Sequence, residues 1–373
     1  MPTPKIIAFY LPQYHPTPDN DKWWGNGFTE WTNVGKAKPL FKDHYQPKVP
    51  ADLGYYDLRL PEVREAQAKL AREAGIYGFC YYHYWFGNGK EELELPFDEV
   101  LRLGTPDLPF MLCWANESWH KKFWNNDGIG SSKEILIEQT YPGEKDIINH
   151  FYRLLPAFKD PRYININGSP LFMIYKPHCL PNPYEFIKIW DSLAIKEGLK
   201  KITFIAFIQS EEEQGREELL SIEKYKNEGY QFICSNRFYK IFKERSILNK
   251  LYYKLKKLYK DYPLRFKYSL YQKCIENDLD LRDDVIPVIY PNWDHTPRSG
   301  GKGFLLEDSS PENFKKALRK LVNKINNKKI EPNLIFLKSW NEWGEGNYVE
   351  PDLKFGKGYI NALKEVIKKD TNV

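Results

Sequence analysis

Residues 333–346 read NLIFLKSWNEWGEG, an apolar run that passes directly into a stretch of tryptophans, glutamates and glycines. The run at 333–339 does not alternate apolar and polar residues, which is typical of a strand buried on both faces, as in a parallel sheet. Tryptophans in the following stretch would be unusual on an open surface. The segment therefore predicts a buried strand that ends in a polar loop with a chemical role.

Seven further runs of this kind recur along the chain, and each is bounded by turn-forming residues. They lie at residues 5–11, 76–82, 109–114, 170–175, 202–208, 231–236 and 285–290. Amphipathic helical stretches lie between them, at 58–74, 144–158, 183–196, 216–228, 311–326 and 356–369. Eight buried strands alternating with helices predict an α/β fold, a (β/α)8 TIM barrel with long βα loops. A doubly wound open sheet is the competing arrangement, but no G-x-G-x-x-G motif follows the first run to favour it.

Length and composition agree with one catalytic domain over residues 1–373. Hydrophobic residues make up 42% of the chain and charged residues 28%, which is ordinary for a globular protein, but the aromatic fraction of 16% is high. Aromatic rings fill cores, and they also stack on the apolar faces of sugar rings.

The sequence shows no run of 18 or more apolar residues and no leader peptide, so we expect a cytoplasmic protein. Five widely spaced cysteines are expected to be reduced thiols: Cys80, Cys113, Cys179, Cys234 and Cys274. No C-x-x-C or similar spacing appears, and the sequence predicts neither a metal ion nor another cofactor.

Active sites of (β/α)8 barrels lie at the C-terminal ends of the strands, and the unusual residues of this chain fall at those ends. Aromatic, amide and carboxylate side chains follow the first, second, third, seventh and eighth predicted strands. The candidate substrate-binding residues are Tyr10, Tyr14, His15, Trp24, Glu30, Trp31, Tyr82, Tyr84, Trp85, Trp114, Asn116, Glu117, Trp119, Trp293, Asp294, Trp340, Asn341 and Trp343. Their gathering at matching ends predicts a carbohydrate-binding cavity.

Glu342 and Glu345 are the candidate catalytic residues, because work on a glycosidic bond needs an acid for the leaving oxygen and a base or nucleophile opposite it. Their i, i+3 spacing would point them to opposite faces of an extended strand. A tight turn through Gly344 and Gly346 would instead let both face one cavity. The alternative is a solvated loop with incidental acids.

Two other acids are candidates for the same cavity. Glu117, directly after Asn116, is expected to bind sugar or to take part in catalysis; the alternative is a structural hydrogen-bonding pair with Asn116. Glu30 lies in a glycine- and tryptophan-rich loop, which either forms a subsite wall or merely covers the barrel.

Two metal-binding patterns carry little weight. His15, His83 and His295 lie at three strand ends, but without H-E-x-x-H or similar spacing they are expected to bond sugar hydroxyls. Asp278-x-Asp280 matches the D-x-D pattern of many sugar-nucleotide transferases, a pattern short enough to occur often by chance.

Residues 237–277 form a basic segment, with twelve lysines or arginines and two acids between Arg237 and Lys273. We expect a basic helical insertion between the sixth and seventh strands. Its helix either packs on the barrel through a Leu/Tyr stripe or lies on an anionic membrane surface. Nucleic-acid binding is not expected, since the positive charge is confined to this segment and no recognised module is present.

A family resemblance rests on five motifs of this chain. They are residues 8–16 (AFYLPQYHP), 24–31 (WGNGFTEW), 81–86 (YYHYWF), 114–117 (WANE) and 340–346 (WNEWGEG). They resemble the WbsX-type proteins, a group called glycosyltransferase WbsX and described as similar to glycoside hydrolase family 99. The resemblance covers nearly the whole chain and is weakest in the basic segment. One departure is His295, where the family has asparagine in its Trp-Asp-Asn-Thr pattern.

The resemblance implies a (β/α)8 barrel that acts on polysaccharides or O-antigen-type glycans. More distantly, the chain is similar to the family 99 endo-α-mannosidases, whose motif Asn-Glu-Trp-His-Glu-Gly corresponds to residues 341–346. By that resemblance, Glu342 assists attack of the sugar's 2-hydroxyl on C1, giving a 1,2-anhydro intermediate, and Glu345 acts as acid and then base. The histidine of that motif is Gly344 here, so the site differs locally and its sugar need not be mannose.

Three functions stay open from the sequence. The first is a retaining, endo-acting glycoside hydrolase with a glutamate pair. The second is a glycosyltransferase in bacterial O-antigen or capsule biosynthesis, acting on a glycan that is lipid-linked at the inner face of the membrane. The third is a glycan-binding barrel without catalysis, which would have little need for two acids at one strand end.

Overall fold

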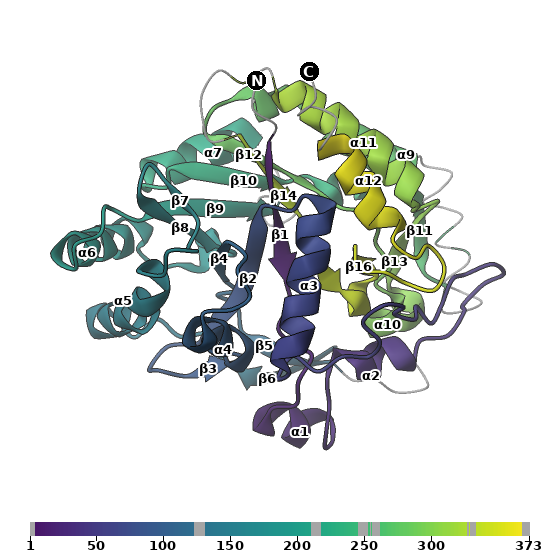
Figure 1. Cartoon of the computed structure of the whole chain (residues 1–373), viewed down its shortest axis with the longest axis horizontal. Helices are drawn as coiled ribbons and strands as arrows, with labels where there is room; N and C mark the ends of the chain where they lie inside the picture. Colours follow the sequence, from purple (N-terminus) through teal and green to yellow (C-terminus); the bar gives the residue numbers. More distant parts are fainter. Residues whose placement is uncertain are drawn as a thin grey trace.

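The computed structural model describes residues 4–122, 131–209, 218–244, 253, 255, 262–326, 328 and 333–367. Eight parallel strands form its centre (Figure 1). They are β1 (Lys5–Tyr10), β2 (Gly78–Trp85), β4 (Phe110–Trp114), β8 (Ser169–Ile174), β9 (Thr203–Gln209), β10 (Phe232–Asn236), β12 (Val285–Ile289) and β14 (Leu334–Leu337). β1 pairs with β14 on one side and with β2 on the other, so the sheet closes. The predicted (β/α)8 barrel is confirmed, with a strand at each of the eight apolar runs.

The barrel interior is packed with side chains. Phe9 on β1 contacts Phe336 on the neighbouring strand β14, with ring centroids 5.6 Å apart. It also contacts Phe207 on β9, on the opposite side of the barrel, at 5.7 Å. The closed sheet therefore presents one chemical face to ligands, at the C-terminal ends of its strands.

Eight helices, one after each strand, surround the barrel. They are α3 (Pro61–Ala74), α4 (Leu95–Leu103), α5 (Glu144–Phe158), α6 (Pro183–Lys196), α7 (Glu218–Asn227), α9 (Tyr268–Ile275), α11 (Pro311–Ile325) and α12 (Gly358–Ile367). Six match helices predicted from the sequence, and α5 and α6 match to the residue. The prediction missed α4 and α9, which are only nine and eight residues long.

The basic segment 237–277 is partly described. It contains a short helix η2 (Phe238–Phe242), then β11 (Leu264–Lys267) and α9. β11 pairs in parallel with β13 (Phe304–Glu307), outside the barrel. Of the lysine-rich run at 250–260, only Tyr253 and Leu255 lie within the described residues. From residue 268 onward the segment is the barrel helix α9, which carries the buried side chains of Tyr268 and Tyr271.

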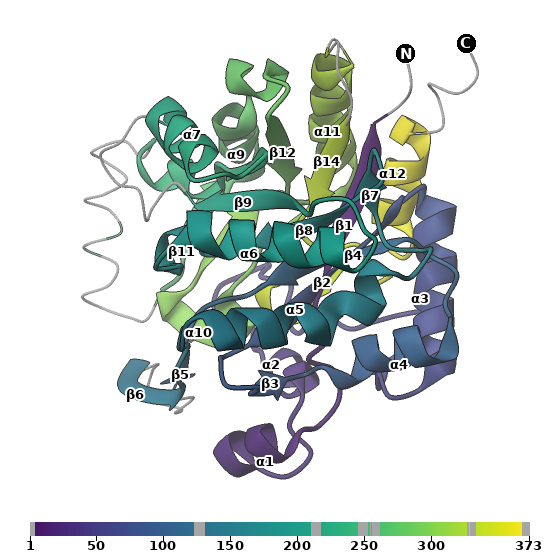
Figure 2. The ribbon, with the colours of Figure 1, turned by 90° about the vertical axis from the view of Figure 1, so that its left-hand side faces the viewer.

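Long βα loops gather at one end of the barrel, as Figure 2 shows for α1, α2, β3, β5 and β6. The loop after β1 contains α1 (Pro18–Trp24) and α2 (Glu30–Gly35), and the loop after β4 contains the hairpin β5 (Trp119–Lys122) and β6 (Ser131–Ile137). The loop after β12 contains α10 (Thr296–Ser299), and the loop after β14 contains β15 (Asn341–Glu342), η5 (Trp343–Glu345) and β16 (Asn347–Tyr348).

A buried carboxyl group, Glu350, supports the loop after β14 from behind. Its side chain accepts hydrogen bonds from Trp343 Nε1 at 2.7 Å, Gln67 Nε2 at 2.7 Å and Tyr56 OH at 2.9 Å. Burial raises the pKa of Glu350 to about 7, and these three donors lower it only in part. Trp343, which lies between the two candidate catalytic glutamates in sequence, is thus fixed by a group that titrates near neutral pH.

We predict that Glu350 makes the stability of this fold depend on pH. The folded chain keeps the Glu350 proton up to about pH 7, whereas the unfolded chain loses it near pH 4.5. The folded state binds more protons between these values, so raising the pH across this window lowers stability, by about 3 kcal/mol from this group. Urea unfolding at several pH values should show a smaller decline in Glu350→Gln. Glu62→Gln, at an exposed glutamate on α3, is the control and should keep the wild-type decline; equal slopes in all three proteins would contradict the prediction.

Candidate active site

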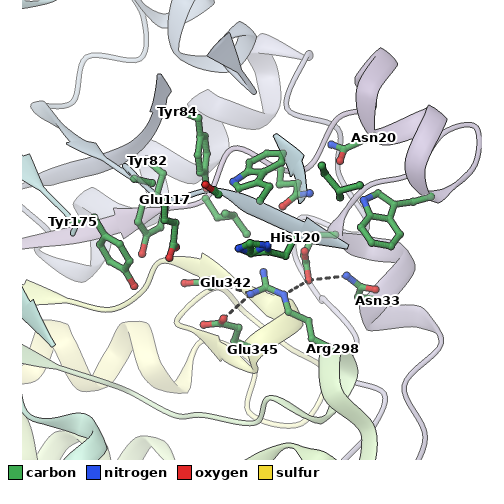
Figure 3. A pocket seen from close by; sticks show the side chains of 18 of the residues that line it. Asn20, Asn33, Tyr82, Tyr84, Glu117, His120, Tyr175, Arg298, Glu342 and Glu345 are labelled. Atoms are coloured by element: carbon green, nitrogen blue, oxygen red, sulfur yellow. Dashed lines mark hydrogen bonds and ion pairs between the residues drawn. The ribbon is translucent and has the colours of Figure 1, made fainter. Parts of the chain in front are cut away.

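A cavity of about 380 Å³ lies at the C-terminal ends of the barrel strands (Figure 3). Its walls come from strand β2, from the loops after β1, β4, β12 and β14, and from Tyr175 and Tyr239, which follow β8 and β10 and which the sequence did not single out. Both candidate catalytic glutamates line it, together with Glu30 and Glu117. The solvated-loop alternative for Glu342 and Glu345 does not hold, since the Glu342 residue is only 6% exposed.

The backbone after β14 explains how two glutamates three residues apart face one cavity. Glu342 lies in β15, where it pairs with Asn347 of β16. The chain then turns through η5 and Gly346, whose φ of 53° lies in the left-handed region that glycine adopts without strain. This turn brings Glu345 back to the side on which Glu342 lies.

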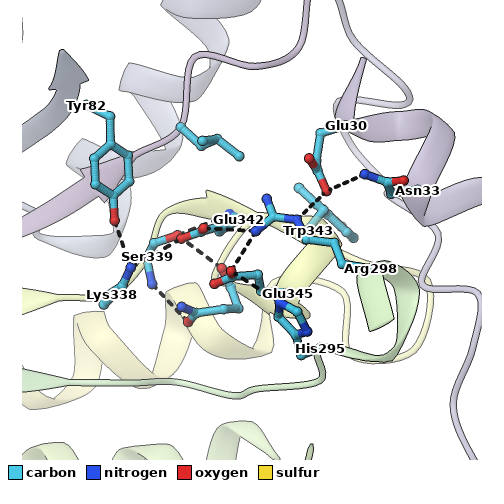
Figure 4. A network of polar contacts seen from close by, with 12 residues as sticks. Glu30, Asn33, Tyr82, His295, Arg298, Lys338, Ser339, Glu342, Trp343 and Glu345 are labelled. Carbon is cyan, nitrogen blue, oxygen red and sulfur yellow. Dashed lines mark hydrogen bonds and ion pairs between the residues drawn. The ribbon is translucent and has the colours of Figure 1, made fainter. Parts of the chain in front are cut away.

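Two cations hold the glutamate pair, and neither was predicted from the sequence. Arg298, on α10, donates from Nη1 to Glu345 Oε1 at 2.6 Å and lies 3.5 Å from Glu342 Oε1 (Figure 4). Lys338 Nζ lies 3.6 Å from the second oxygen of Glu342 and donates to Tyr82 OH at 2.7 Å. Lys338 could have been noticed as a charged residue at the end of an apolar run, four residues before Glu342. Nothing in the sequence marks Arg298.

The environment of Glu342 favours its protonated form. Burial raises the pKa of Glu342 and the charge of Glu345 raises it further, against the opposing charges of Lys338 and Arg298. One nitrogen of Arg298 lies 2.6 Å from Glu345 Oε1 and 3.5 Å from Glu342 Oε1, and two carboxyl groups brought together in this way repel each other when both are ionised. One carboxyl group in each form, an acid and a base, is what chemistry at a glycosidic bond requires.

Aromatic side chains line the cavity in two groups. Tyr82 on β2 and Tyr175 and Tyr239, which follow β8 and β10, come from the barrel or from residues close to its strand ends, whereas Trp24 and Trp119 lie on α1 and β5 of the long loops. The Trp119 ring also contacts Tyr84, with centroids 5.2 Å apart, which links the hairpin β5–β6 to β2. Rings in these positions can stack on sugars above and below the reacting bond.

Glu117 lies in the same cavity but in a different environment. Its side chain is 48% exposed, and Lys176 Nζ lies 3.8 Å from one carboxylate oxygen. The neighbouring Asn116 is fully buried, and its amide exchanges hydrogen bonds with the Lys176 backbone at 2.8 and 2.9 Å. Asn116 therefore shapes the loop, while Glu117 is free to meet a ligand.

The predicted binding residues divide into two groups. Trp24, Glu30, Tyr82, Tyr84, Glu117, Trp119 and Trp293 line the cavity. The others lie behind it and are used by the fold: Tyr10, Tyr14, His15, Trp31, Trp85, Trp114, Asn116, Asp294, Trp340, Asn341 and Trp343. The side chain of Asn341, for example, exchanges two hydrogen bonds with the backbone of Leu11, at 2.8 and 3.0 Å.

Asp294 illustrates this supporting role. It accepts hydrogen bonds at one oxygen from Gln46 at 2.6 Å and His44 at 2.9 Å. Burial alone would raise the pKa of Asp294, but the His44 hydrogen bond and the charge of Lys48 lower it to about 2. Its backbone N–H donates to the Glu345 carbonyl oxygen at 2.7 Å. Asp294 thus fixes the loop that carries Glu345.

The three strand-end histidines do not come together. His83 pairs with His150 at 2.9 Å, His15 bonds the Pro12 carbonyl, and His295 Nε2 lies 3.7 Å from Glu345 Oε1. In the part of the chain that the structure describes, no group of three or more His, Cys, Asp or Glu residues could hold a metal ion. No helix among the described residues is long and apolar enough to cross a membrane.

Two asparagines of the cavity were not predicted from the sequence. Asn20 on α1 and Asn33 on α2 line the cavity and are buried. Their amide oxygens have no hydrogen-bond partner within the described chain. They reach the cavity because α1 and α2 fold over it. The sequence alone does not determine how these two helices are placed.

Comparison with known structures supports the barrel. A structure described as a glycoside hydrolase-like protein superposes with a TM-score of 0.59 at 15% identity, covering 99% of this chain and 95% of that one. The GH99 endo-alpha-mannosidase from Bacteroides thetaiotaomicron superposes with a TM-score of 0.54 at 14% identity, covering 98% and 96%. At these identities the likeness shows a shared fold.

Sequence comparisons are more specific. Two curated relatives from strains of Xanthomonas campestris pv. campestris, both described as uncharacterized protein WxcX, are 34% identical to this chain. The matches cover 99% of this chain and 50% of each relative, so the chain spans about half their length. A family model described as Glycosyltransferase WbsX matches residues 6–363. The resemblance inferred from five motifs is thereby confirmed: this chain belongs to the Glycosyltransferase WbsX family.

Proposed function

We propose that this protein is a carbohydrate-active enzyme that acts on glycosidic bonds with Glu342 and Glu345, by retaining chemistry through a 1,2-anhydro sugar. The observation that carries the proposal is the approach of both carboxyl groups to one nitrogen of Arg298 at the cavity. This nitrogen lies 2.6 Å from Glu345 Oε1 and 3.5 Å from Glu342 Oε1, and Lys338 lies 3.6 Å from the other oxygen of Glu342. A single proton shared by the pair leaves one carboxylate to act as base and one carboxyl group to act as acid.

In the proposed reaction, Glu342 accepts the proton of the sugar's 2-hydroxyl as that oxygen attacks C1. Glu345 gives its proton to the leaving glycosidic oxygen, and the bond from C1 to that oxygen breaks. The anhydro ring then opens when water attacks C1; Glu345 takes the proton of the water and Glu342 returns its proton to O2. Two displacements at C1 retain the anomeric configuration. The charges of Lys338 and Arg298 favour the ionised form of Glu342 that the first step requires, so the proton of the pair is on Glu345 when that step begins.

Hydrolysis and transfer differ only in the molecule that opens the anhydro sugar. Water gives a hydrolase, whereas a sugar hydroxyl in the same position gives a transferase. The family's description favours transfer, and the acid–base pair serves both. A binding barrel without catalysis is the weaker alternative, because burying two adjacent carboxyl groups costs free energy that binding alone does not require.

The substrate we propose is an oligo- or polysaccharide of the O-antigen or capsule type, in lipid-linked form where assembly takes place at the inner face of the membrane. The two aromatic regions of the cavity support a substrate with sugars on both sides of the reacting bond. We also propose that residues 237–277 contact the membrane surface. The lysine-rich run of this segment, residues 250–260, lies mostly outside the described residues.

The glutamate pair is tested with Glu342→Gln and Glu345→Gln. A panel of purified bacterial O-antigen and capsular polysaccharides identifies the glycan that the wild-type protein cleaves or extends, by product analysis. On that glycan each variant should lose activity by about 10²-fold or more, because each loses a proton-transfer step. Calorimetry should show that glycan binding persists. Glu117→Gln is the comparison and should change KM more than kcat; wild-type turnover by Glu345→Gln would remove Glu345 from the mechanism.

Sugar stacking by the tryptophans of the long loops is tested with Trp119→Ala. Loss of a stacking ring should raise KM for the same glycan by about three- to tenfold and leave kcat nearly unchanged, since the ring lies away from the reacting carboxyl groups. Tyr184→Ala, at an exposed ring on α6, should leave both constants as they are. A loss confined to kcat would place Trp119 at the reacting bond.

A further inference from the structure

The space that a side chain at residue 344 would occupy is filled by the carboxylate of Glu30. Gly344 lies between the two catalytic glutamates of the proposed mechanism, on the buried turn η5. A Cβ atom there would collide with a carboxylate oxygen of Glu30; it would lie 2.6 Å from the Glu30 carboxyl carbon and 3.0 Å from Arg298 Nε. The φ angle of Gly344 is not in the left-handed region, so the requirement for glycine here is one of space.

Glu30 occupies this space because α2 places it there. Thr29 caps the N-terminus of α2, Glu30 is its first residue, and α2 packs against η5. The Glu30 residue is 2% exposed, and one carboxylate oxygen accepts from Arg298 Nε at 2.8 Å and from Asn33 Nδ2 at 3.3 Å. A carboxylate that is so buried and so engaged contacts the protein rather than a sugar.

Arg298 connects Glu30 to the reacting groups. Its Nε is held by Glu30, and its Nη1 donates to Glu345 and lies near Glu342, as Figure 4 shows. A guanidinium group is planar, so fixing Nε also fixes the direction of Nη1. Burial would disfavour the charged form of Arg298, but Glu30, then Glu345 and Glu342, raise its pKa above the usual range. Arg298 is therefore always charged. Glu30 sets its orientation through Nε, and a different nitrogen of the guanidinium group contacts Glu345.

We propose that Glu30 and Arg298 are positioning residues for Glu345, and that glycine is required at 344 because the Glu30 carboxylate takes the place of that residue's side chain. The inference rests on the proposed function, in which Glu345 moves the proton of the leaving oxygen. It also accounts for the departure from the Asn-Glu-Trp-His-Glu-Gly motif: a histidine at 344 and a glutamate at 30 cannot share this space. Glu30 thus lines the cavity but acts through Arg298.

A double-mutant cycle of Gly344→Ala, Glu30→Ala and the double variant tests whether Glu30 excludes a side chain at residue 344. On the panel glycan that the wild-type protein turns over, Gly344→Ala should lower kcat by about 10²-fold, because it displaces the Glu30–Arg298 pair. In the Glu30→Ala background the same change should lower kcat by less than about threefold, because the collision is gone. Gly35→Ala, at the other end of α2 with open space around its Cβ position, is the matched control and should keep wild-type kcat.

Conservative variants test the positioning role without a collision. Glu30→Gln keeps the shape of Glu30 and removes its charge, and Arg298→Lys keeps the charge and removes the planar fork. Each should lower kcat by about tenfold or more while KM changes less than about threefold, since the groups act on Glu345 and not on bound sugar. A rise in KM at unchanged kcat would overturn the proposal and make Glu30 a sugar-binding residue.

Urea unfolding of the same four proteins separates this proposal from the proposed function. Gly344→Ala should lower the urea midpoint more in the wild-type background than in the Glu30→Ala background, whatever the reaction. Equal shifts in the two backgrounds would overturn the inference that Glu30 fills this space. Coupling in the midpoint without coupling in kcat would overturn the positioning role. Wild-type turnover by Glu345→Gln, together with coupling in the midpoint, would overturn the proposed function and leave the steric finding in place.

Discussion

One guanidinium group, that of Arg298, holds the centre of this site together. It contacts the carboxylates of Glu30, Glu342 and Glu345, which come from the loops after β1 and β14, while Arg298 itself follows β12. Three carboxylates gathered in a largely buried place would repel one another, and the cation compensates that repulsion. Other hydrogen bonds, such as that from the Asp294 backbone N–H to the Glu345 carbonyl oxygen, also join these loops, but the meeting of three carboxylates at the cavity depends on this cation.

A second layer, behind the first, fixes the backbone that carries the glutamates. Asn341 bonds the end of β1 through its side chain, and Trp343 is stacked on Tyr348 with centroids 3.8 Å apart. Glu350 accepts a hydrogen bond from the indole N–H of Trp343, and Asp294 accepts hydrogen bonds from His44 and Gln46. Many aromatic and polar residues of the WNEWGEG stretch therefore hold the turn rigid. Glu342 and Glu345 are the residues of this stretch that line the cavity. Rigid support of this kind is what keeps reacting groups within the small tolerance that catalysis requires.

The sequence predicted the barrel well and the site in part, for physical reasons that differ. Strands buried on both faces must be continuously apolar, so β1, β8 and β14 could be recognised from composition. The helix α9 was missed because its stripe of Tyr268, Tyr271, Cys274 and Ile275 spans only eight residues at the end of a basic segment. Which side of a loop faces the cavity depends on tertiary contacts, so Trp119 and Trp340 looked equivalent although only Trp119 lines the cavity. Arg298 was invisible for the same reason, since its partners lie 268 and 47 residues away in sequence.

The shape of the cavity bears on what reaches the glutamate pair. The tyrosines Tyr82 and Tyr175 come from barrel strands or directly follow them, so their positions are set by the closed sheet. Trp24 on α1 begins the WGNGFTEW motif on which the family resemblance rests. Trp119 is carried by the β5–β6 hairpin, which lies outside the barrel and which other sequences can vary without disturbing it. A barrel of this design can keep one acid–base pair for one reaction and change its glycan through the outer loops. In the mechanism we propose, the sugar that forms the anhydro ring would lie against the tyrosines, and the chain that leaves or enters would lie along the tryptophans. Hydrolysis and transfer would then be decided by what the outer loops admit to C1, and not by the glutamates themselves.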